Sequence, residues 1–309
     1  MISVVIPAYN EEQNIPILYQ KLTQVLVGKD YEIIFVDDGS EDGTFEVLEK
    51  IADTDKRVKV IRFKRNYGQT SAMYAGFQHA KGDVIVTMDA DLQNDPEDIP
   101  TLLKKLEEGY DLVSGWRKER KDPFLSRKLP SMVANWIISK ATGVHLHDYG
   151  CTLKVYRAEL LKELELYGDM HRFLPALTKR QGAKITEIVV RHHPRLYGKS
   201  KYGIGRTIRV ILDILLVKFL NEYINKPMYV FGTAGFLLFA VGMLTLLYLT
   251  FLKLFGEDIG RRPLLILSVL LILAGIQLIS TGILAEMMVR IYYRIKEEKP
   301  YIIEKTINL

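Results

Sequence analysis

Short apolar runs alternate with longer amphipathic stretches through the first half of the chain. The runs are typical of buried strands, and we predict strands at 2–6, 32–36, 58–63, 84–88 and 112–114. Between them, the spacing of apolar residues predicts helices near 11–27, 43–54, 69–80 and 96–108. This alternation predicts an α/β domain with a mainly parallel sheet.

The last third of the chain has a different pattern. Two stretches, 228–252 and 264–285, contain no charged residue. A membrane-spanning helix needs about 20 apolar residues, so we expect both stretches to span a membrane. The connection between them is short, which predicts a hairpin with both chain ends on one side. Lys and Arg are concentrated outside the pair, and this bias predicts that the N-terminal domain is cytoplasmic.

These patterns divide the chain into four parts. An apolar stretch that carries Arg206, Arg209 and Asp213 at helical spacing predicts a helix at the membrane interface, and a core helix of the N-terminal domain is the alternative. We therefore expect a multi-pass protein of the inner or plasma membrane with both termini cytoplasmic. The expected parts are a cytoplasmic domain at 1–203, an interfacial helix or linker at 204–226, two transmembrane helices within 227–288 (about 228–252 and 264–286) and a cytoplasmic tail at 289–309.

Composition narrows the classes of function. The chain has 309 residues and a formal net charge of +5, which gives no case for nucleic acid as a partner. Cys151 is the only cysteine, so no intrachain disulfide can form, as expected in a reducing compartment. The first seven residues lack a basic region and are predicted to be a strand, not a signal peptide.

Two carboxylates follow the predicted strand at 84–88. Residues two apart on a strand point to the same face, so Asp89 and Asp91 can reach one hard cation, and Gln93 adds a neutral oxygen. Mg²⁺ or Mn²⁺ held in this way keeps open positions for substrate phosphates. The pattern therefore indicates a site for a nucleoside diphosphate compound. Acidic pairs are common in loops, so this pattern alone has low specificity.

Other polar residues near these motifs have a structural interpretation. Asp95 precedes Pro96 and two further acids, which is typical of a helix N-terminus with Asp95 as its cap. Asn10 and Gln13 have the spacing of a capping box, and we assign Asn10 to capping.

Three polar clusters follow predicted strands, at 7–11, 37–40 and 89–91. Ligands of parallel α/β sheets bind beyond the carboxyl ends of the strands. The convergence of the three clusters predicts a binding site at that edge of the sheet.

The motifs together resemble a known family. VVIPAYNE at 4–11, VDDGSEDGT at 36–44, NYG at 66–68 and MDADLQ at 88–93 resemble the family 2 glycosyltransferases of the GT-A fold. DYGC at 148–151, MHRF at 170–173, RLYGKSKY at 195–202 and the end of the hairpin narrow the resemblance to the polyisoprenyl-phosphate glycosyltransferases. That group includes bactoprenol glucosyltransferases and dolichol-phosphate mannose synthases. The chain lacks the Q-x-x-R-W block of processive synthases, which argues against a polysaccharide polymerase.

The resemblance implies roles for residues on the donor side. Asp38 is expected to face the base or ribose, whereas Asp37 anchors its loop. Gly68 and Gly76 are expected to allow close approach of the donor, and helix packing is the alternative role for Gly76. The metal is expected on Asp89, Asp91 and Gln93. The full set expected to bind the nucleotide sugar is Pro7, Tyr9, Glu11, Asp38, Gly68, Asp89, Ala90, Ser200 and Lys201.

The resemblance also implies an acceptor side. The expected ligands of the lipid phosphate are Arg117, Arg127, Arg195, His171 and Arg172. A solvated surface is the alternative for the basic run 117–128, and attraction to anionic headgroups is the alternative for the later basic residues. Asp148 is the candidate catalytic carboxylate, with Asp91, Arg117 and Arg127 as the other catalytic candidates. A lipid monophosphate is already largely anionic at neutral pH, since its second pKa is about 6, so orienting a substrate is an alternative role for Asp148.

The reaction implied is metal-dependent transfer of a monosaccharide, with inversion, to undecaprenyl or dolichyl phosphate. Glucose from UDP-glucose is the first expectation and mannose from GDP-mannose the second, while modified pentoses and N-acetylhexosamines stay open. The resemblance also suggests a homo-oligomer. A sugar nucleotidyltransferase would need a glycine-rich loop after the first strand, which residues 7–10 do not provide. A membrane protein that binds sugar nucleotides without catalysis is the non-enzyme alternative.

Overall fold

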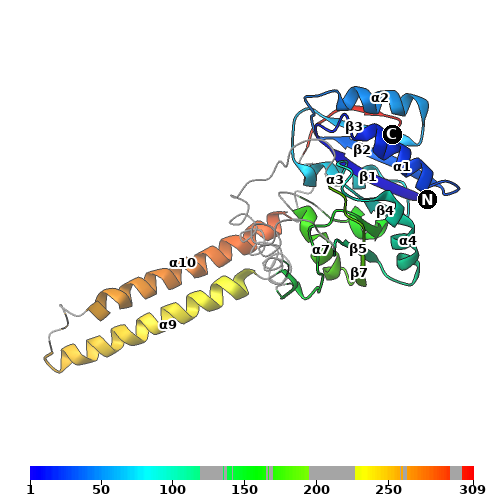
Figure 1. The fold of residues 1–309 in the computed structure, drawn as a ribbon. Coiled ribbons are helices and arrows are strands. Elements are labelled where there is room, and N and C mark those ends of the chain that lie inside the picture. Colours follow the sequence, from blue (N-terminus) through cyan, green and yellow to red (C-terminus); the bar gives the residue numbers. More distant parts are fainter. Residues whose placement is uncertain are drawn as a thin grey trace. The chain divides into compact units, whose positions relative to one another are not determined.

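The computed structural model describes residues 1–118, 135, 138–140, 142–164, 166, 170–194, 227–257, 259, 263–292 and 301–309. The chain forms two compact units (Figure 1). The first consists of Met1–Val217 and Lys299–Leu309, and the second of Lys218–Glu298. The ends of the chain therefore belong to one unit, and the apolar helices to the other.

The first unit is built on a mixed, mostly parallel sheet of eight strands in the order β7-β5-β6-β4-β1-β2-β3-β8. Strands β1 to β4 run parallel, as do β5 and β7, whereas β6 and β8 are antiparallel to their neighbours. The strands are β1 (Ile2–Ala8), β2 (Tyr31–Asp37), β3 (Val58–Phe63), β4 (Val84–Thr87), β5 (Leu112–Trp116), β6 (Lys154–Arg157), β7 (Ile185–Val189) and β8 (Ile303–Ile307).

Helices lie on both faces of this sheet. Val4 and Ile6 of β1 pack into one core with α1, α2 and α4, while Val5 between them faces α3 on the other side. Strand β2 is buried along its whole length, as expected for a central parallel strand covered on both faces. The described helices of this unit are α1 (Ile15–Val25), α2 (Thr44–Thr54), α3 (Gln69–His79), η1 (Pro96–Asp98), α4 (Ile99–Glu107), α6 (Ala158–Lys162), η3 (Met170–Phe173) and α7 (Leu174–Arg180).

The predicted α/β class is confirmed, and each predicted strand and helix of the first half is present with small shifts at its ends. The capping assignments differ in outcome. Asp95 caps η1 as predicted, because its Oδ1 accepts a hydrogen bond from the Glu97 backbone N–H at 3.1 Å. The capping box of Asn10 is wrong, since α1 begins after Asn14. Asn10 instead adopts a left-handed backbone with φ of 55° and accepts from the N–H of Glu41 at 2.9 Å.

The segment predicted as a tail at 289–309 contains a strand. β8 pairs antiparallel with β3 and completes that edge of the sheet, so the last described residues belong to the first unit (Figure 1). Its sequence, IEKTI, exposes three polar side chains between two partly buried isoleucines. Such a short strand at a sheet edge has little apolar signal from which to predict it.

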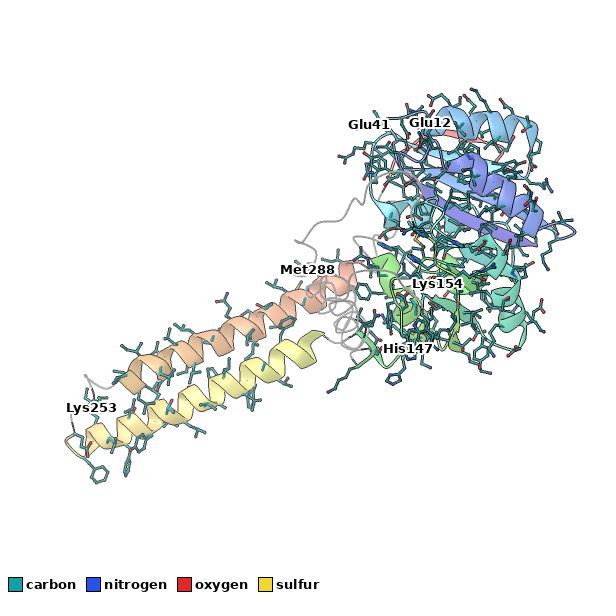
Figure 2. The ribbon with its side chains drawn as sticks, in the orientation of Figure 1. Glu12, Glu41, His147, Lys154, Lys253 and Met288 are labelled. Carbon is teal, nitrogen blue, oxygen red and sulfur yellow. The ribbon has the colours of Figure 1, made fainter. Side chains whose placement is uncertain are left out.

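The second unit contains α9 (Pro227–Leu254) and α10 (Pro263–Tyr292), which confirm the predicted pair of long apolar helices. Each contains a stretch long and apolar enough to cross a membrane, Phe231–Leu254 and Pro263–Ala285. Figure 2 shows that the described side chains along both helices are mostly hydrocarbon. The predicted interfacial helix at 204–226 lies outside the described residues.

Small residues bring α9 and α10 close together. A Cβ added to Gly235 would lie 2.7 Å from the carbonyl oxygen of Gly275, so only glycine fits at this crossing. Ser268 donates a hydrogen bond to the Thr245 hydroxyl at 2.8 Å across the same interface. Close backbone approach and interhelical hydrogen bonds are the usual means by which helices associate in lipid.

Candidate active site

A pocket of about 340 Å³ opens at the carboxyl ends of β1, β2 and β4. The three polar clusters predicted to converge do meet here, because parallel strands end at the same edge of the sheet. Eleven residues line the pocket: Pro7, Ala8, Tyr9, Glu11, Asp38, Asn66, Gly68, Gln69, Asp89, Ala90 and Asp91. Every described residue predicted to bind the nucleotide sugar is among them.

Asp89 lies at the centre of the polar contacts of this pocket. Its Oδ1 accepts a hydrogen bond from Gln69 Nε2 at 2.7 Å, and its Oδ2 accepts one from the Thr152 hydroxyl at 2.8 Å. Part of the side chain is exposed to the pocket, but protein atoms surround the rest. Burial and the neighbouring Asp91 charge raise the pKa of Asp89 to about 6. The carboxylate pair therefore favours a nearby positive charge.

Asp91 and Gln93 differ in their relation to the pocket. Asp91 lines it and accepts from the Gln93 backbone N–H at 3.1 Å. Gln93 does not line it, and its backbone oxygen accepts from the N–H of His193 at 2.9 Å. Among the described residues, no group of three or more His, Cys, Asp or Glu side chains is placed to hold a metal ion. The two aspartates fit a hard cation whose remaining ligands are water and substrate phosphate.

Asp37 and Asp38 both hold loops around the pocket. Asp37 accepts from the Ser40 N–H at 3.0 Å, in agreement with its predicted anchoring role. Asp38 accepts from the backbone N–H groups of Tyr67 and Gly68 at 2.7 and 2.9 Å. The residue predicted to face the base or ribose therefore also fixes the neighbouring loop that leads into α3.

The two glycines near α3 have different surroundings. Gly68 caps α3 with a φ of 92°, and no atom lies within 4 Å of the position that a Cβ would take there, so it leaves open space in the pocket wall. Gly76 lies against β1, where an added Cβ would come within 2.3 Å of Val5 Cγ1. The packing alternative for Gly76 agrees with this contact.

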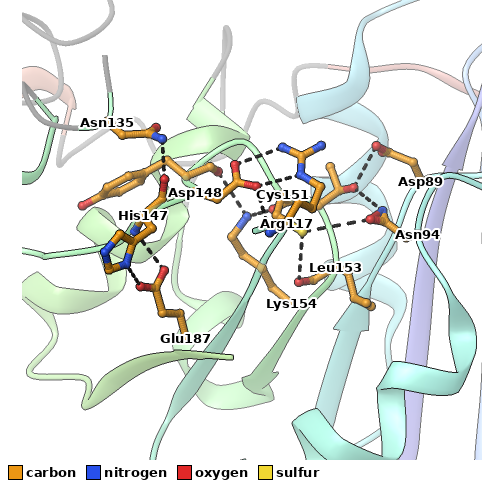
Figure 3. A network of polar contacts seen from close by, with 12 residues as sticks. Asp89, Asn94, Arg117, Asn135, His147, Asp148, Cys151, Leu153, Lys154 and Glu187 are labelled. Carbon is orange, nitrogen blue, oxygen red and sulfur yellow. Dashed lines mark hydrogen bonds and ion pairs between the residues drawn. The ribbon is translucent and has the colours of Figure 1, made fainter. Parts of the chain in front are cut away.

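Arg117 and Asp148 form a largely buried ion pair at the end of β5. Arg117 Nε donates to Asp148 Oδ2 at 2.7 Å, and its Nη2 donates to Oδ1 at 3.0 Å (Figure 3). Burial acts to lower the pKa of Arg117, but the hydrogen bonds to Asp148 and the charges of nearby acidic groups, Asp89 among them, together outweigh it and raise that pKa. The guanidinium therefore stays charged, and both carboxylate oxygens of Asp148 are occupied by it.

One segment, Asp148 to Lys154, connects this ion pair to Asp89 (Figure 3). Its Thr152 hydroxyl donates to Asp89 and accepts from Asn94 Nδ2 at 2.9 Å. The buried ammonium of Lys154 donates to the backbone oxygens of Tyr149, at 3.3 Å, and Cys151. Burial lowers the pKa of Lys154. The segment from Asp148 to Lys154 therefore contributes both to the Arg117–Asp148 pair and to the contacts that hold Asp89 in the pocket.

The remaining predicted residues fall into two groups. His171 is buried, with its Nδ1 2.7 Å from the Thr70 hydroxyl in the first turn of α3, and Arg172 beside it is partly exposed. Arg127, Arg195, Ser200 and Lys201 lie outside the described residues. Sequence reasoning missed Gln69, Thr152 and Lys154. Only Gln69 had a signal, since it directly follows the NYG motif.

A model of the family described as "Glycosyl transferase family 2" matches residues 3–165, more than half of the chain. The chain belongs to glycosyl transferase family 2. The matched region includes β1 to β6, the whole lined pocket and the Arg117–Asp148 pair. The pocket is accordingly the candidate active site of a glycosyltransferase.

Curated relatives match almost the full length of this glycosyltransferase. A dodecaprenyl-phosphate galacturonate synthase of Rhizobium johnstonii is 47% identical, over 98% of this chain and 92% of the relative. An undecaprenyl-phosphate 4-deoxy-4-formamido-L-arabinose transferase of Pectobacterium atrosepticum is 37% identical, over 99% of this chain and 94% of the relative. The similarity therefore extends through both apolar helices.

Solved structures share the fold. Glucosyl-3-phosphoglycerate synthase of Mycobacterium tuberculosis, in complex with Mn²⁺, UDP and phosphoglyceric acid, superposes with a TM-score of 0.56 at 22% identity. The match covers 71% of this chain and 78% of that chain. The GT-A fold expected from the motifs is confirmed.

Proposed function

We propose that this glycosyltransferase moves a monosaccharide from a nucleoside diphosphate sugar to a polyprenyl phosphate, giving a polyprenyl-phosphate sugar. The observation that carries the proposal is the pocket lined by Asp89 and Asp91 in a chain that also has two helices long enough to span a membrane. A polyprenyl acceptor is confined to a bilayer, so its transferase must work at one. The full-length relatives named for polyprenyl-phosphate sugars support the same acceptor.

The names of the relatives change the order of candidate donors. The sequence motifs favoured glucose and then mannose, whereas the relatives are named for galacturonate and 4-deoxy-4-formamido-L-arabinose. We place a galacturonate donor first, because that relative has 47% identity over nearly the whole chain. The formamido-arabinose donor is second, and UDP-glucose and GDP-mannose complete the panel.

The donor diphosphate is expected to lie between the aspartate pair and the first turn of α3. Asp89 and Asp91 would hold Mg²⁺ or Mn²⁺, which when bound neutralises charge on the diphosphate. Gln69 and Thr152 fix the orientation of Asp89 for this task. Gln93 stays a predicted metal ligand. It does not line the pocket, so its loop would have to move for its side chain to reach the metal.

The chemical step is proposed as a single displacement with inversion. An oxygen of the lipid phosphate forms the new bond to the anomeric carbon, and the bond to the nucleoside diphosphate breaks with its electron pair on the leaving oxygen. The phosphate is already anionic, so no proton must be removed. Asp148 accepts two hydrogen bonds from the Arg117 guanidinium, which suits it to orient that group and not to act as a base.

Arg117 is the described residue best suited to contact the acceptor phosphate. Its guanidinium stays positively charged, and its Nη1 takes no part in the hydrogen bonds to Asp148. His171 and Arg172 stay candidates for the same phosphate, as do Arg127 and Arg195. Ser200 and Lys201 stay candidates for the donor. Positioning and charge stabilisation would then supply most of the rate.

The membrane arrangement follows from the same proposal. Cytoplasmic nucleotide sugars require the first unit to lie in the cytoplasm, with the hairpin of α9 and α10 in the inner or plasma membrane. The surplus of Lys and Arg outside the hairpin supports this orientation. Assembly into a homo-oligomer stays a prediction.

The test is a transfer assay with the purified full chain, undecaprenyl phosphate and labelled donors: UDP-galacturonate, UDP-4-deoxy-4-formamido-L-arabinose, UDP-glucose and GDP-mannose. Each donor is incubated with MnCl₂ and with EDTA. We expect metal-dependent label in the lipid phase from one donor, and its loss in Asp91→Asn. Glu97→Gln is the matched control, because Glu97 is a nearby acid on the surface, paired with Arg191.

Failure of all four donors to label the lipid would overturn the proposed reaction. Nucleotide binding that persists without turnover would then favour the non-catalytic alternative. Label that survives EDTA and the Asp91→Asn substitution would reject the metal site while leaving the transfer itself in place.

A further inference from the structure

The strand β8 is connected to the pocket by way of β3, with which it pairs. It lies at the edge of the sheet, antiparallel to β3, and the Lys64 N–H donates to the Ile302 oxygen at 3.2 Å. β3 continues directly into the loop at 66–68, whose Asn66 and Gly68 line the pocket. A segment that follows α10 in the chain is therefore bonded to an element that forms the donor site.

One line of contact starts at Tyr301, just before β8. Tyr301 is 6% exposed, and its ring stacks on Phe63 with centroids 5.0 Å apart. Phe63 in turn meets the edge of Tyr67 at 5.7 Å. The Tyr67 backbone N–H is the group that donates to Asp38 in the pocket wall. Loss of the Tyr301 ring would leave a cavity beside Phe63, which contacts Tyr67 of the loop at 66–68.

A second line of contact starts at Glu304 in β8. Its carboxylate lies 3.4 Å from Arg62 Nε, and the same nitrogen lies 3.8 Å from a carboxylate oxygen of Asp37. Asp37 is fully buried and holds the loop at 37–40 through the Ser40 N–H. Glu304 therefore helps to orient Arg62, which faces Asp37, the residue that anchors the loop at 37–40.

We propose that Tyr301 and Glu304 are positioning residues for the donor pocket, and that β8 holds the loops at 37–40 and 66–68 in the arrangement that binds a nucleoside diphosphate. The inference rests on the proposed function in taking this pocket as the donor site. A strand that served only to cover the sheet edge would need backbone pairing with β3, but not these two contacts toward the loops.

The substitution Tyr301→Phe can separate the role of the Tyr301 ring from that of its hydroxyl. The hydroxyl is buried and has no hydrogen-bond partner among the described residues, and burial is the main cause that raises the pKa of Tyr301 to about 12. The ring therefore carries the positioning, and Tyr301→Phe is expected to keep donor affinity. The same substitution removes an unpaired buried polar group and is expected to leave the protein equally or more stable.

The experiment measures UDP binding to the full chain in detergent with MnCl₂ by titration calorimetry, and GDP is used where the unchanged protein binds GDP instead. Tyr301→Ala is expected to weaken nucleotide binding about tenfold, and Glu304→Gln to weaken it by a smaller factor. Tyr301→Phe is expected to match the unchanged protein. Lys305→Ala is the matched control, because Lys305 lies on the same strand but pairs with Glu49 of α2 at 2.6 Å.

Steady-state kinetics supply the second readout. We expect Tyr301→Ala to raise KM for the sugar donor while KM for polyprenyl phosphate changes less than twofold. A lower unfolding temperature for Tyr301→Ala, together with unchanged nucleotide affinity, would overturn the inference. β8 would then be a purely structural strand. Where Tyr301→Ala does not fold, Glu304→Gln decides, since that side chain is about half exposed.

The two hypotheses fail in different ways. An unchanged protein that binds neither UDP nor GDP would overturn the proposed function, and with it the donor pocket. An unchanged protein that binds nucleotide as tightly as both the Tyr301→Ala and Glu304→Gln variants would overturn only the positioning role.

Discussion

Asp89 shows how a catalytic requirement opposes stability at the level of one residue. Two neutral donors hold its oxygens, yet burial and the charge of Asp91 raise its pKa to about 6. A carboxyl with a higher pKa in the folded protein stabilises the fold while protonated. That contribution is present below pH 4, the value for the unfolded chain, and is lost as the pH rises toward 6.

We therefore predict that Asp89→Asn stabilises the metal-free protein at pH 7.5, by roughly 1–3 kcal/mol, and has little effect at pH 4. Thermal unfolding in EDTA can be followed by tryptophan fluorescence, because both tryptophans, at 116 and 136, precede the apolar helices in the sequence. MnCl₂ should raise the unfolding temperature of the unchanged protein only. An equal gain at both pH values would mean that charge is not the cause.

The residue scale also separates what the sequence could predict from what it could not. Asp38, Gly68 and the Asp89–Asp91 pair stand in motifs directly after strands, so their place at the sheet edge follows from local pattern. Thr152 reaches Asp89 across 63 positions of sequence, and Lys154, at the start of β6, binds carbonyl oxygens of the loop that precedes it. Neither contact leaves a local pattern, because both depend on how β6 enters the sheet.

At the scale of elements, apolar continuity decided which strands could be predicted. β1 to β4 are mostly buried, apolar-rich runs and were found from the sequence. β6, β7 and β8 are short and carry charged residues, since they lie beside the parallel core or at the sheet edges. Their apolar signal is too weak to distinguish a strand from a loop.

The packing of α3 on β1 gives a prediction at this scale. Gly76→Ala would place a methyl group 2.3 Å from Val5 Cγ1, so helix and strand must move apart. We expect a loss of about 1–3 kcal/mol of unfolding free energy, although alanine favours the helix itself. Val5→Ala in the same chain should restore most of the loss. Thermal unfolding of the two single variants and the double variant tests this, and additive losses would contradict the contact.

At the scale of the whole molecule, the proposed topology has a direct test. Cys151 is buried with no exposed surface, so a membrane-impermeant maleimide should not label the unchanged chain in intact cells. A cysteine at Glu257, in the connection between α9 and α10, should be labelled from outside. A cysteine at Lys305 should be labelled only after the cells are opened. Labelling of Lys305→Cys in intact cells would reverse the orientation.

The place of β8 in the chain has a consequence for biosynthesis. A ribosome makes α9 and α10 before it makes the strand that completes the sheet, so the edge of β3 stays unpaired until both apolar helices have emerged. If β8 positions the pocket loops, the ability to bind nucleotide is acquired last, after the hairpin is available to the membrane. Chains whose synthesis stops inside the hairpin would then neither bind donor nor protect that edge from other strands.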